Sequence, residues 1–207
     1  INRTLKKMGE EPVVYDTLQA HLSCEDLRVA LQNMGYMNAS VDLDKKIRGK
    51  KLTAIYNIHP GEPYMIDKFS YDIEDSIVAK VLAPHLLSDH NQPKQFTVSS
   101  LDEERKRLTH ILNDSGYYRF NKDFIYYTAD STLGRQHVNV TLHLSKYVEG
   151  SGSKPTLHPR YIIKDVNFIP GDSTGFNFSK SVHEENTLIE KSKYFSATDL
   201  QNTYNSI

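Results

Sequence analysis

The stretch Leu108-Thr109-His110-Ile111-Leu112-Asn113-Asp114-Ser115-Gly116-Tyr117-Tyr118-Arg119-Phe120 sets the pattern for the whole chain. Leu108 and Leu112 are one helical turn apart, so the stretch predicts the end of an amphipathic helix. Gly116 is then a structural helix stop, because glycine accepts the positive φ that the C′ position of a helix often needs. The aromatic residues that follow lead into a predicted strand.

A version of this stretch occurs earlier in the chain, from Leu27 to Ala39. Placing Gly35 on Gly116 also places Leu31 on Leu112, so Gly35 is a second predicted helix stop. Ser23 has the chemistry of an N-cap residue, which places the start of this earlier helix there.

The beginning of a third version lies at the C-terminus, where Phe195 to Leu200 matches Phe96 to Leu101. A unit that recurs at a spacing of roughly 80 to 100 residues is too large for a solenoid repeat. It suits tandem small domains, each with a core of its own.

Strands are indicated by apolar residues that alternate with polar ones. An opening strand runs from Tyr64 to Ile73, and Tyr161 to Phe168 repeats its pattern. The clearest alternation is in the last strand of the second copy, with apolar residues at every other position from Val138 to Leu144. In the first copy, two alternating segments around Arg48-Gly49-Lys50 predict an antiparallel hairpin.

The predicted unit is strand, helix, helix, strand, strand, which is an α+β fold: a three-stranded sheet covered by two helices. We expect residues 1–62 to form a first unit without its opening strand, and residues 63–149 to form a complete unit. Residues 150–207 are then a linker and the start of a truncated third unit. We predict the joint between the first two units at Pro60, Gly61, Pro63 and Tyr64, because two prolines stiffen the chain.

The segment Val148 to Pro155 lies between the second and third copies. Glycine and serine dominate it, which favours a flexible linker or a long turn. It superficially resembles a phosphate-binding loop, but it lacks the order Gly-Lys-Ser/Thr, so we do not expect a nucleotide there.

Charge, hydrophobicity and the spacing of reactive residues argue against several classes of function. The net charge of -1 over 207 residues gives no reason to expect nucleic acid as a partner. No apolar run is long enough for a membrane-spanning helix. His137 and His143 share a strand face without a further ligand, so a metal is not expected and surface positions suit them better. No nucleophile has a supporting base, so we expect neither an enzyme nor a cofactor.

Four motifs resemble the POTRA (polypeptide-transport-associated) domains that precede the barrel of BamA/TamA-type outer-membrane assembly proteins. They are Leu31 to Ala39, Ile58 to Phe69, Leu112 to Phe120 and Tyr161 to Phe168, and they include the Gly-Tyr helix end and the Gly-Glu-Pro-Tyr-x-Ile junction. The Tyr-rich, Lys- and Asp-rich style is similar to that of TamA-like proteins of the Bacteroidetes type.

The resemblance implies a periplasmic scaffold on the inner side of the bacterial outer membrane, attached to a C-terminal membrane barrel of the same parent chain. Its expected partners are unfolded outer-membrane or exported polypeptides and accessory periplasmic proteins. A POTRA region of a secretion transporter is the closest alternative. A soluble enzyme of an unrelated α+β fold is a more distant one, and it would need a pocket with perturbed titrating groups.

The resemblance also implies a mechanism, strand addition, in which a client pairs with the free backbone groups of an edge strand. Two edges are candidates: Asn38 to Ile47, and Asn121 to Ala129. The first carries charged residues that would block uncontrolled pairing. The preferred docking edge is therefore Phe124, Ile125, Tyr126 and Tyr127. A competing interpretation is that these aromatic residues only cover the core.

Overall fold

The computed structural model describes residues 14–86, 94–132, 134–150, 152–167 and 186–206. The chain divides into two compact units: unit 1 is Ile1–Tyr64 with Gln95–Thr97, and unit 2 is Met65–Lys94 with Val98–Ile207. The start of the predicted third copy thus falls in unit 2. Helices and strands are mixed along the chain, which confirms the α+β class.

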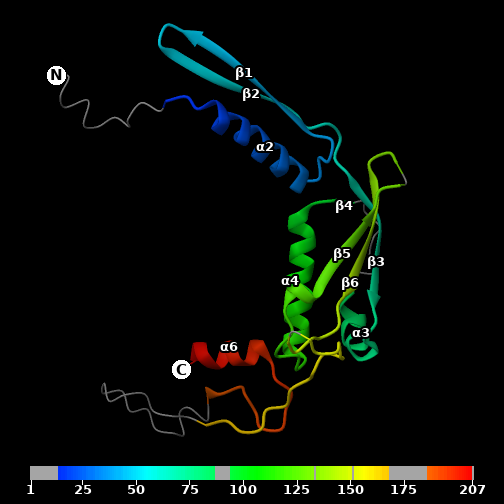
Figure 1. Ribbon diagram of the computed structural model, residues 1–207. Helices are drawn as coiled ribbons and strands as arrows, with labels where there is room; N and C mark the ends of the chain where they lie inside the picture. The colour runs from blue at the N-terminus through cyan, green and yellow to red at the C-terminus, as the bar shows by residue number, and fades with distance from the viewer. Residues whose placement is uncertain (1–13, 87–93, 133, 151, 168–185, 207) are drawn as a thin grey trace, which may run out of the picture. The chain divides into compact units, whose positions relative to one another are not determined.

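Unit 1 consists of one helix and one hairpin. Helix α2 (Thr17–Asn33) lies along the hairpin of β1 (Ser40–Arg48) and β2 (Lys51–His59), as Figure 1 shows. The two strands pair antiparallel, with Ser40 opposite His59. Ala20 and Cys24 are the buried residues of the helix.

The predicted start of the first helix was wrong. Asp16, not Ser23, is the N-cap, and its carboxylate accepts from the backbone N–H of Leu18 at 2.8 Å. Ser23 lies inside the helix, where its hydroxyl donates to the carbonyl of Gln19 at 2.9 Å. Because this hydroxyl already bonds a carbonyl of the preceding turn, Ser23 is accommodated inside the helix and does not cap its start.

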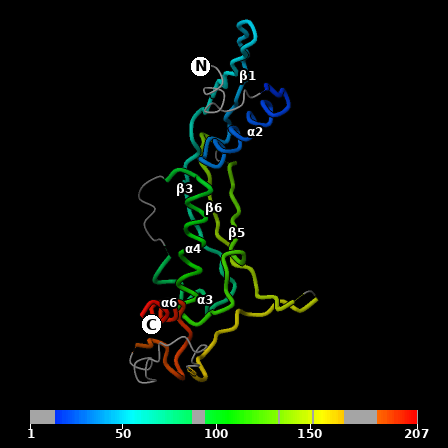
Figure 2. The backbone as a smooth tube through the Cα atoms, turned by 90° about the vertical axis from the view of Figure 1, so that its left-hand side faces the viewer, coloured from blue at the N-terminus to red at the C-terminus, as the bar shows by residue number. Residues whose placement is uncertain are grey.

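Unit 2 has the predicted order of strand, helix, helix, strand, strand. Its elements are β3 (Met65–Ile73), α3 (Ser76–Leu82), the short 3-10 helix η1 (Ala83–His85), β4 (Lys94–Gln95), α4 (Val98–Asp114), the 3-10 helix η2 (Lys122–Phe124), β5 (Ile125–Asp130), β6 (His137–Leu144) and α6 (Ala197–Ser206). The sheet order is β4-β3-β6-β5. Strand β6 pairs parallel with β3 and antiparallel with β5. Helices α3 and α4 lie beside this sheet (Figures 1 and 2).

The core of unit 2 lies between the sheet and the two helices. Every second residue of β6 is buried, as the alternation predicts: Val138, Val140, Leu142 and Leu144. Leu108 and Leu112 of α4 and Leu82 of α3 are fully buried against them. The hydrophobic burial of these side chains holds the helices on the sheet.

Two features differ from the expectations, and a third agrees with one of the two predicted alternatives. The sheet has a fourth, two-residue strand, β4, which sequence patterning cannot detect at that length. The opening strand expected at 161–168 is an isolated bridge between Ile162 and Tyr194 in the part that the structure describes. The segment after Val148 forms a long turn, because Tyr147 and Thr156 exchange two backbone hydrogen bonds of 3.0 and 2.8 Å.

Candidate docking edge

Strand β5 is the outermost strand on its side of the sheet in unit 2, since the order ends β6-β5. The helix stop leads directly into it. Gly116 has φ +100°, and the backbone N–H of Tyr117 donates to the carbonyl of Leu112 at 3.0 Å. The N–H of Phe120 then donates to Tyr117 at 2.9 Å. This chain of turns places the start of β5 next to the end of β6.

The backbone of β5 alternates between groups that face β6 and groups that face outward. The N–H of Ser145 donates to the carbonyl of Phe124 at 2.7 Å, and these two residues continue the register that pairs Ile125 with Leu144. In an antiparallel ladder such hydrogen-bonded pairs recur at every second residue. The backbone groups of Tyr126 and Thr128 therefore face β6.

The residues between them face outward. These groups are the carbonyl of Ile125 and both backbone groups of Tyr127 and of Ala129. None of these five groups has a backbone partner among the described residues. Unpaired N–H and C=O groups in a row form a template for another strand. Strand β5 thus offers a free edge from Ile125 to Ala129, which is two residues on either side of Tyr127.

The four residues of the predicted docking edge have different surroundings. Ile125 is buried, and Phe124 is half-buried against Phe120 and His158. Tyr127 is half-buried and its hydroxyl donates to the carbonyl of Leu101 at 2.9 Å; burial raises its pKa above the usual range. Tyr126 alone is exposed, at 52%. The covering interpretation therefore fits three of the four side chains, and Tyr126 is the exception.

The start of β5 is tied to helix α4 by charged groups. Arg105 donates to the carbonyl of Lys122 at 2.8 Å, and the Lys122 ammonium lies 2.8 Å from Asp102. Hydrogen bonds from Lys106 and from Lys122 lower the pKa of Asp102 to about 2. Asp102 is therefore ionised at any pH near neutrality, and the network holds η2 in place below the edge.

A row of side chains that sequence reasoning missed crosses the polar face of this sheet. Asp72 of β3, His143 of β6 and Tyr126 of β5 are directly opposite one another in the registers of the three strands. His143 Nδ1 lies 2.9 Å from Asp72 Oδ2, and His143 Nε2 lies 2.9 Å from the Thr128 hydroxyl. The Tyr126 ring stacks on the imidazole at 4.9 Å. Alternation alone places His143 on the polar face but gives no hint of its partner 71 residues away.

The other candidate edge, Asn38 to Ile47, lies in β1 of unit 1. Three of its charged side chains contact neighbours. Asp44 accepts from Asn57 at 2.8 Å, and Lys45 lies over the ring of Tyr15 at 5.1 Å. Asp42 lies 3.5 Å from His59. Side chains of this kind along an edge hinder the pairing of a further strand.

The predicted joint and the two helix stops share one backbone pattern. In unit 1 the N–H of Tyr64 donates to the carbonyl of Gly35 at 2.8 Å, and the carbonyl of Tyr64 accepts from Phe96 at 2.8 Å. Of the other joint residues, Gly61 has φ +69°. Pro60 and Pro63 flank it in the segment that leads to Tyr64.

Unit 2 repeats the pattern at the start of the predicted third copy. The N–H of Tyr161 donates to the carbonyl of Gly116 at 2.8 Å, and the carbonyl of Tyr161 accepts from Phe195 at 3.1 Å. A Cβ on Gly116 would lie 2.9 Å from Arg160 Cγ and 3.1 Å from Tyr194 Cδ1. The glycine is thus required for its φ and for the close approach of the following segment.

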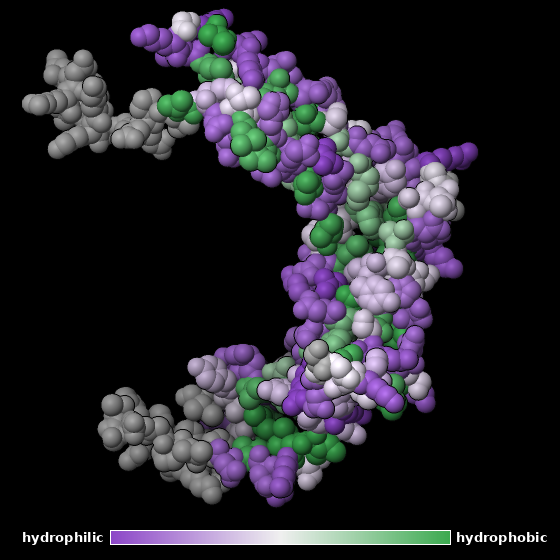
Figure 3. Space-filling view, viewed as in Figure 1, coloured by the Kyte–Doolittle hydropathy of each residue, from purple (hydrophilic) through white to green (hydrophobic). Residues whose placement is uncertain are grey.

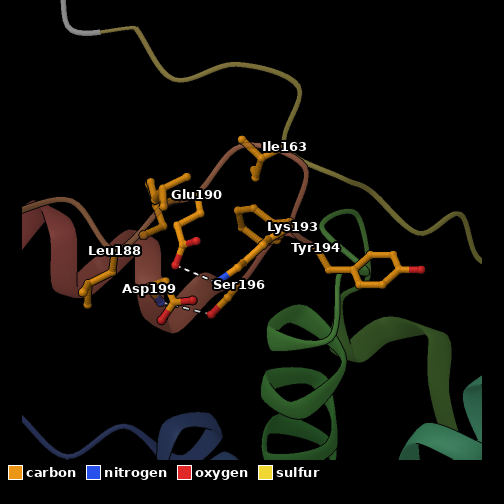
Figure 4. Close-up of a pocket in the computed structure, with 10 residues that line it drawn as sticks. Ile163, Leu188, Glu190, Lys193, Tyr194, Ser196 and Asp199 are labelled. Atoms are coloured by element: carbon orange, nitrogen blue, oxygen red, sulfur yellow. Dashed lines mark hydrogen bonds and ion pairs between the residues drawn. The ribbon is translucent and has the colours of Figure 1, made fainter. Parts of the chain in front are cut away.

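The described ranges offer no metal-binding cluster, and a sizeable cavity among them lies away from β5. The described residues contain no group of three or more metal-ligating side chains. A cavity of about 170 Å³ lies at the C-terminal segment, where Lys193 pairs with Glu190 at 2.6 Å and the N–H of Asp199 donates to Ser196 Oγ (Figure 4). Hydrophobic residues gather on this segment in the face shown in Figure 3. Within the described ranges, no helix is both long and apolar enough to span a membrane.

Comparisons with known proteins give structural matches only. No protein-family model matches the sequence, and no curated protein matches it significantly. The crystal structure of POTRA domains 3–5 of BamA from Haemophilus influenzae is 13% identical, with a TM-score of 0.47; the match covers 95% of this chain and 71% of that one.

BamA from Haemophilus ducreyi, in a crystal structure lacking POTRA domains 1–3, is also 13% identical, with a TM-score of 0.38. That match covers 65% of this chain and 24% of the other. Both structures contain the domain type that the sequence motifs resemble. At such identities and TM-scores, the fold assignment rests on the element order of the chain itself.

Proposed function

We propose that the chain is a periplasmic scaffold region of an outer-membrane β-barrel assembly or translocation protein, and that β5 docks extended segments of client polypeptides. The observation that carries the proposal is the outward row of backbone groups at Ile125, Tyr127 and Ala129, which have no backbone partner in the part of the chain that the structure describes. The element order of unit 2 and the four POTRA-like motifs support the assignment to this class.

The mechanism is strand addition. A client segment extends the β4-β3-β6-β5 sheet by one strand, and its backbone pairs with Tyr127 and Ala129. Backbone pairing depends little on client sequence, which suits a receptor for many polypeptides. Each hydrogen bond contributes only about 1 kcal/mol, so the docked state is weak and reversible, as a transfer step requires.

The same proposal gives the chain no catalytic role. Its partners are unfolded outer-membrane or exported polypeptides and accessory periplasmic proteins, and its place is at the periplasmic face of the outer membrane. The charged side chains of β1, among them Asp44 and Lys45, support a division of labour in which the unit 1 edge is protected and the unit 2 edge is used.

The test replaces one outward-facing donor. Ala129→Pro removes the N–H of Ala129, which has no partner in the β5–β6 ladder, and proline is tolerated on an edge where the N–H faces outward. Ala129→Val is the matched control, since it keeps the N–H. The dissociation constant of a fluorescently labelled, unfolded barrel precursor is measured by anisotropy against residues 1–207.

We expect Ala129→Pro to weaken binding by at least about fivefold, the equivalent of one lost hydrogen bond. Ala129→Val should bind like the unaltered chain, and both variants should keep its far-ultraviolet circular dichroism. Equal affinity of the proline and valine variants would sink the proposal that this edge docks clients.

A further inference from the structure

We propose that Tyr126 selects for an aromatic side chain in the docked segment, and that His143 is the positioning residue that holds the Tyr126 ring for this contact. The inference rests on the proposed docking at β5 and adds a preference to it. It assigns a role to the one exposed aromatic residue of the edge.

The Tyr126 ring has a fixed orientation although it is exposed. Its ring lies nearly parallel to the imidazole of His143, at 15° and 4.9 Å between centroids. The imidazole is held at both nitrogens, by Asp72 on one side and by Thr128 on the other, each at 2.9 Å. His143 itself is mostly covered, with 20% of its side chain exposed. The stack therefore orients Tyr126 before any client arrives.

The position of Tyr126 in the ladder brings a client side chain close to it. Because its backbone groups face β6, Tyr126 forms a non-hydrogen-bonded pair with an antiparallel strand added outside β5. In such pairs the Cα atoms are only about 4.5 Å apart and the side chains are closest. The client residue opposite Tyr126 continues the row formed by Asp72, His143 and Tyr126 across the sheet.

The chemistry of this row favours an aromatic partner. The one carboxylate of the row, Asp72, is hydrogen-bonded to His143 and lies on β3, two strands in from β5. A charged client residue beside Tyr126 therefore has no oppositely charged neighbour in the row. Cross-strand pairs of two aromatic residues are among the favourable pairs on a sheet face. Tyr126 adds such a partner at low entropic cost, since its ring is already ordered.

The test compares two synthetic peptides of about ten residues, the length of a long strand. Both alternate threonine and valine, and one has a central phenylalanine where the other has alanine. Dissociation constants are measured for residues 1–207 and for variants. We expect the phenylalanine peptide to bind about threefold more tightly to the unaltered chain. Tyr126→Ala should bring this ratio to about one, whereas Tyr126→Phe should keep it.

His143 is tested through the same ratio. His143→Ala removes the stacked ring and should lower the ratio, whereas His143→Phe keeps a ring there and should retain it. If His143 has only a structural role, His143→Ala should weaken the binding of both peptides equally and leave the ratio at about threefold. That result would overturn its positioning role.

The two proposals fail in different ways. If both peptides bind the unaltered chain equally and Ala129→Pro weakens both, selection by Tyr126 is wrong while docking at β5 stands. If Ala129→Pro changes the affinity of neither peptide, docking itself is wrong, and the selection falls with it.

Discussion

At the scale of single residues, Gly116 combines a helix end, a positive φ and a close approach of the following segment. It follows the end of α4, it has a positive φ, and its carbonyl accepts a hydrogen bond from the backbone N–H of Tyr161. Arg160 and Tyr194 approach it so closely that even a methyl group would displace them. One glycine thus connects helix termination to the docking of the next segment.

Gly116→Ala should therefore destabilise the chain more than Gly134→Ala. Both glycines have positive φ, but a Cβ at Gly134 would meet no atom within 4 Å. Gly134→Ala should lower the free energy of unfolding by about 1 kcal/mol, the cost of the backbone strain. Gly116→Ala should lower it by about 2 to 4 kcal/mol, because displaced side chains add to that strain. Urea denaturation measures both, and equal losses would contradict the close-approach argument.

Sequence reasoning worked well at this scale where local chemistry decides the outcome. The positive φ of Gly35 and Gly116 follows from the preference of glycine at helix ends. The predicted N-cap of α2, Ser23, was wrong. Asp16, seven residues earlier, has equally suitable capping chemistry and is the N-cap in the structure. In the structure Asp16 accepts from the backbone N–H groups of Leu18 and Gln19, so the helix begins before Ser23.

At the scale of elements, the long turn after β6 is held by a buried histidine. His158 is 7% exposed and lies among Phe120, Phe124 and Tyr147. Its Nε2 donates to the carbonyl of Ser145 at 2.8 Å, and its backbone N–H donates to Asp75. The Gly- and Ser-rich composition of Val148 to Pro155 favours flexibility, but the side chain of His158 anchors the end of this turn to the rest of unit 2.

This anchor should make the turn sensitive to acid. Burial lowers the pKa of His158 below its usual 6.5, which outweighs the opposite effects of the Ser145 carbonyl and of Asp75. The neutral ring is the form that packs, so its stabilisation is complete above the unfolded pKa and is lost as the pH falls through the folded pKa. The urea concentration at the unfolding midpoint should therefore decrease as the pH is lowered from 7.5 to 5.

His158→Phe is the matched variant, because it keeps an aromatic ring in the cage and cannot titrate. The fall of the urea midpoint over the same pH range should be smaller for this variant. A fall as large as that of the unaltered chain would assign the acid sensitivity to other groups and contradict the role of His158.

Element order was predictable because strands and helices have different periods. The alternation in β6 and the stripe of Leu108 and Leu112 each identify one buried face. Sheet order and register were not predictable in the same way. The row of Asp72, His143 and Tyr126 forms only when β3, β6 and β5 pair in one register, which depends on packing between segments far apart in the chain.

At the scale of the whole molecule, the account makes a prediction about the parent gene. The proposed function implies a membrane barrel in the same parent chain, beyond the rest of the truncated third unit. The codons for that part should specify segments of about ten residues with alternating hydrophobicity and aromatic girdles. Sequencing the parent gene tests this. A soluble domain with no barrel in the parent protein would contradict the assignment to an assembly or translocation protein.

The central claim, that β5 is an open edge that clients occupy, is tested most directly by amide hydrogen exchange, followed residue by residue with NMR. In the free chain, the N–H groups of Tyr127 and Ala129 should exchange fast, whereas those of Tyr126 and Thr128, which face β6, should be protected. A saturating unfolded barrel precursor should slow exchange at Tyr127 and Ala129 and leave the other two unchanged. Fast exchange at Tyr127 and Ala129 in the saturated complex would contradict the claim.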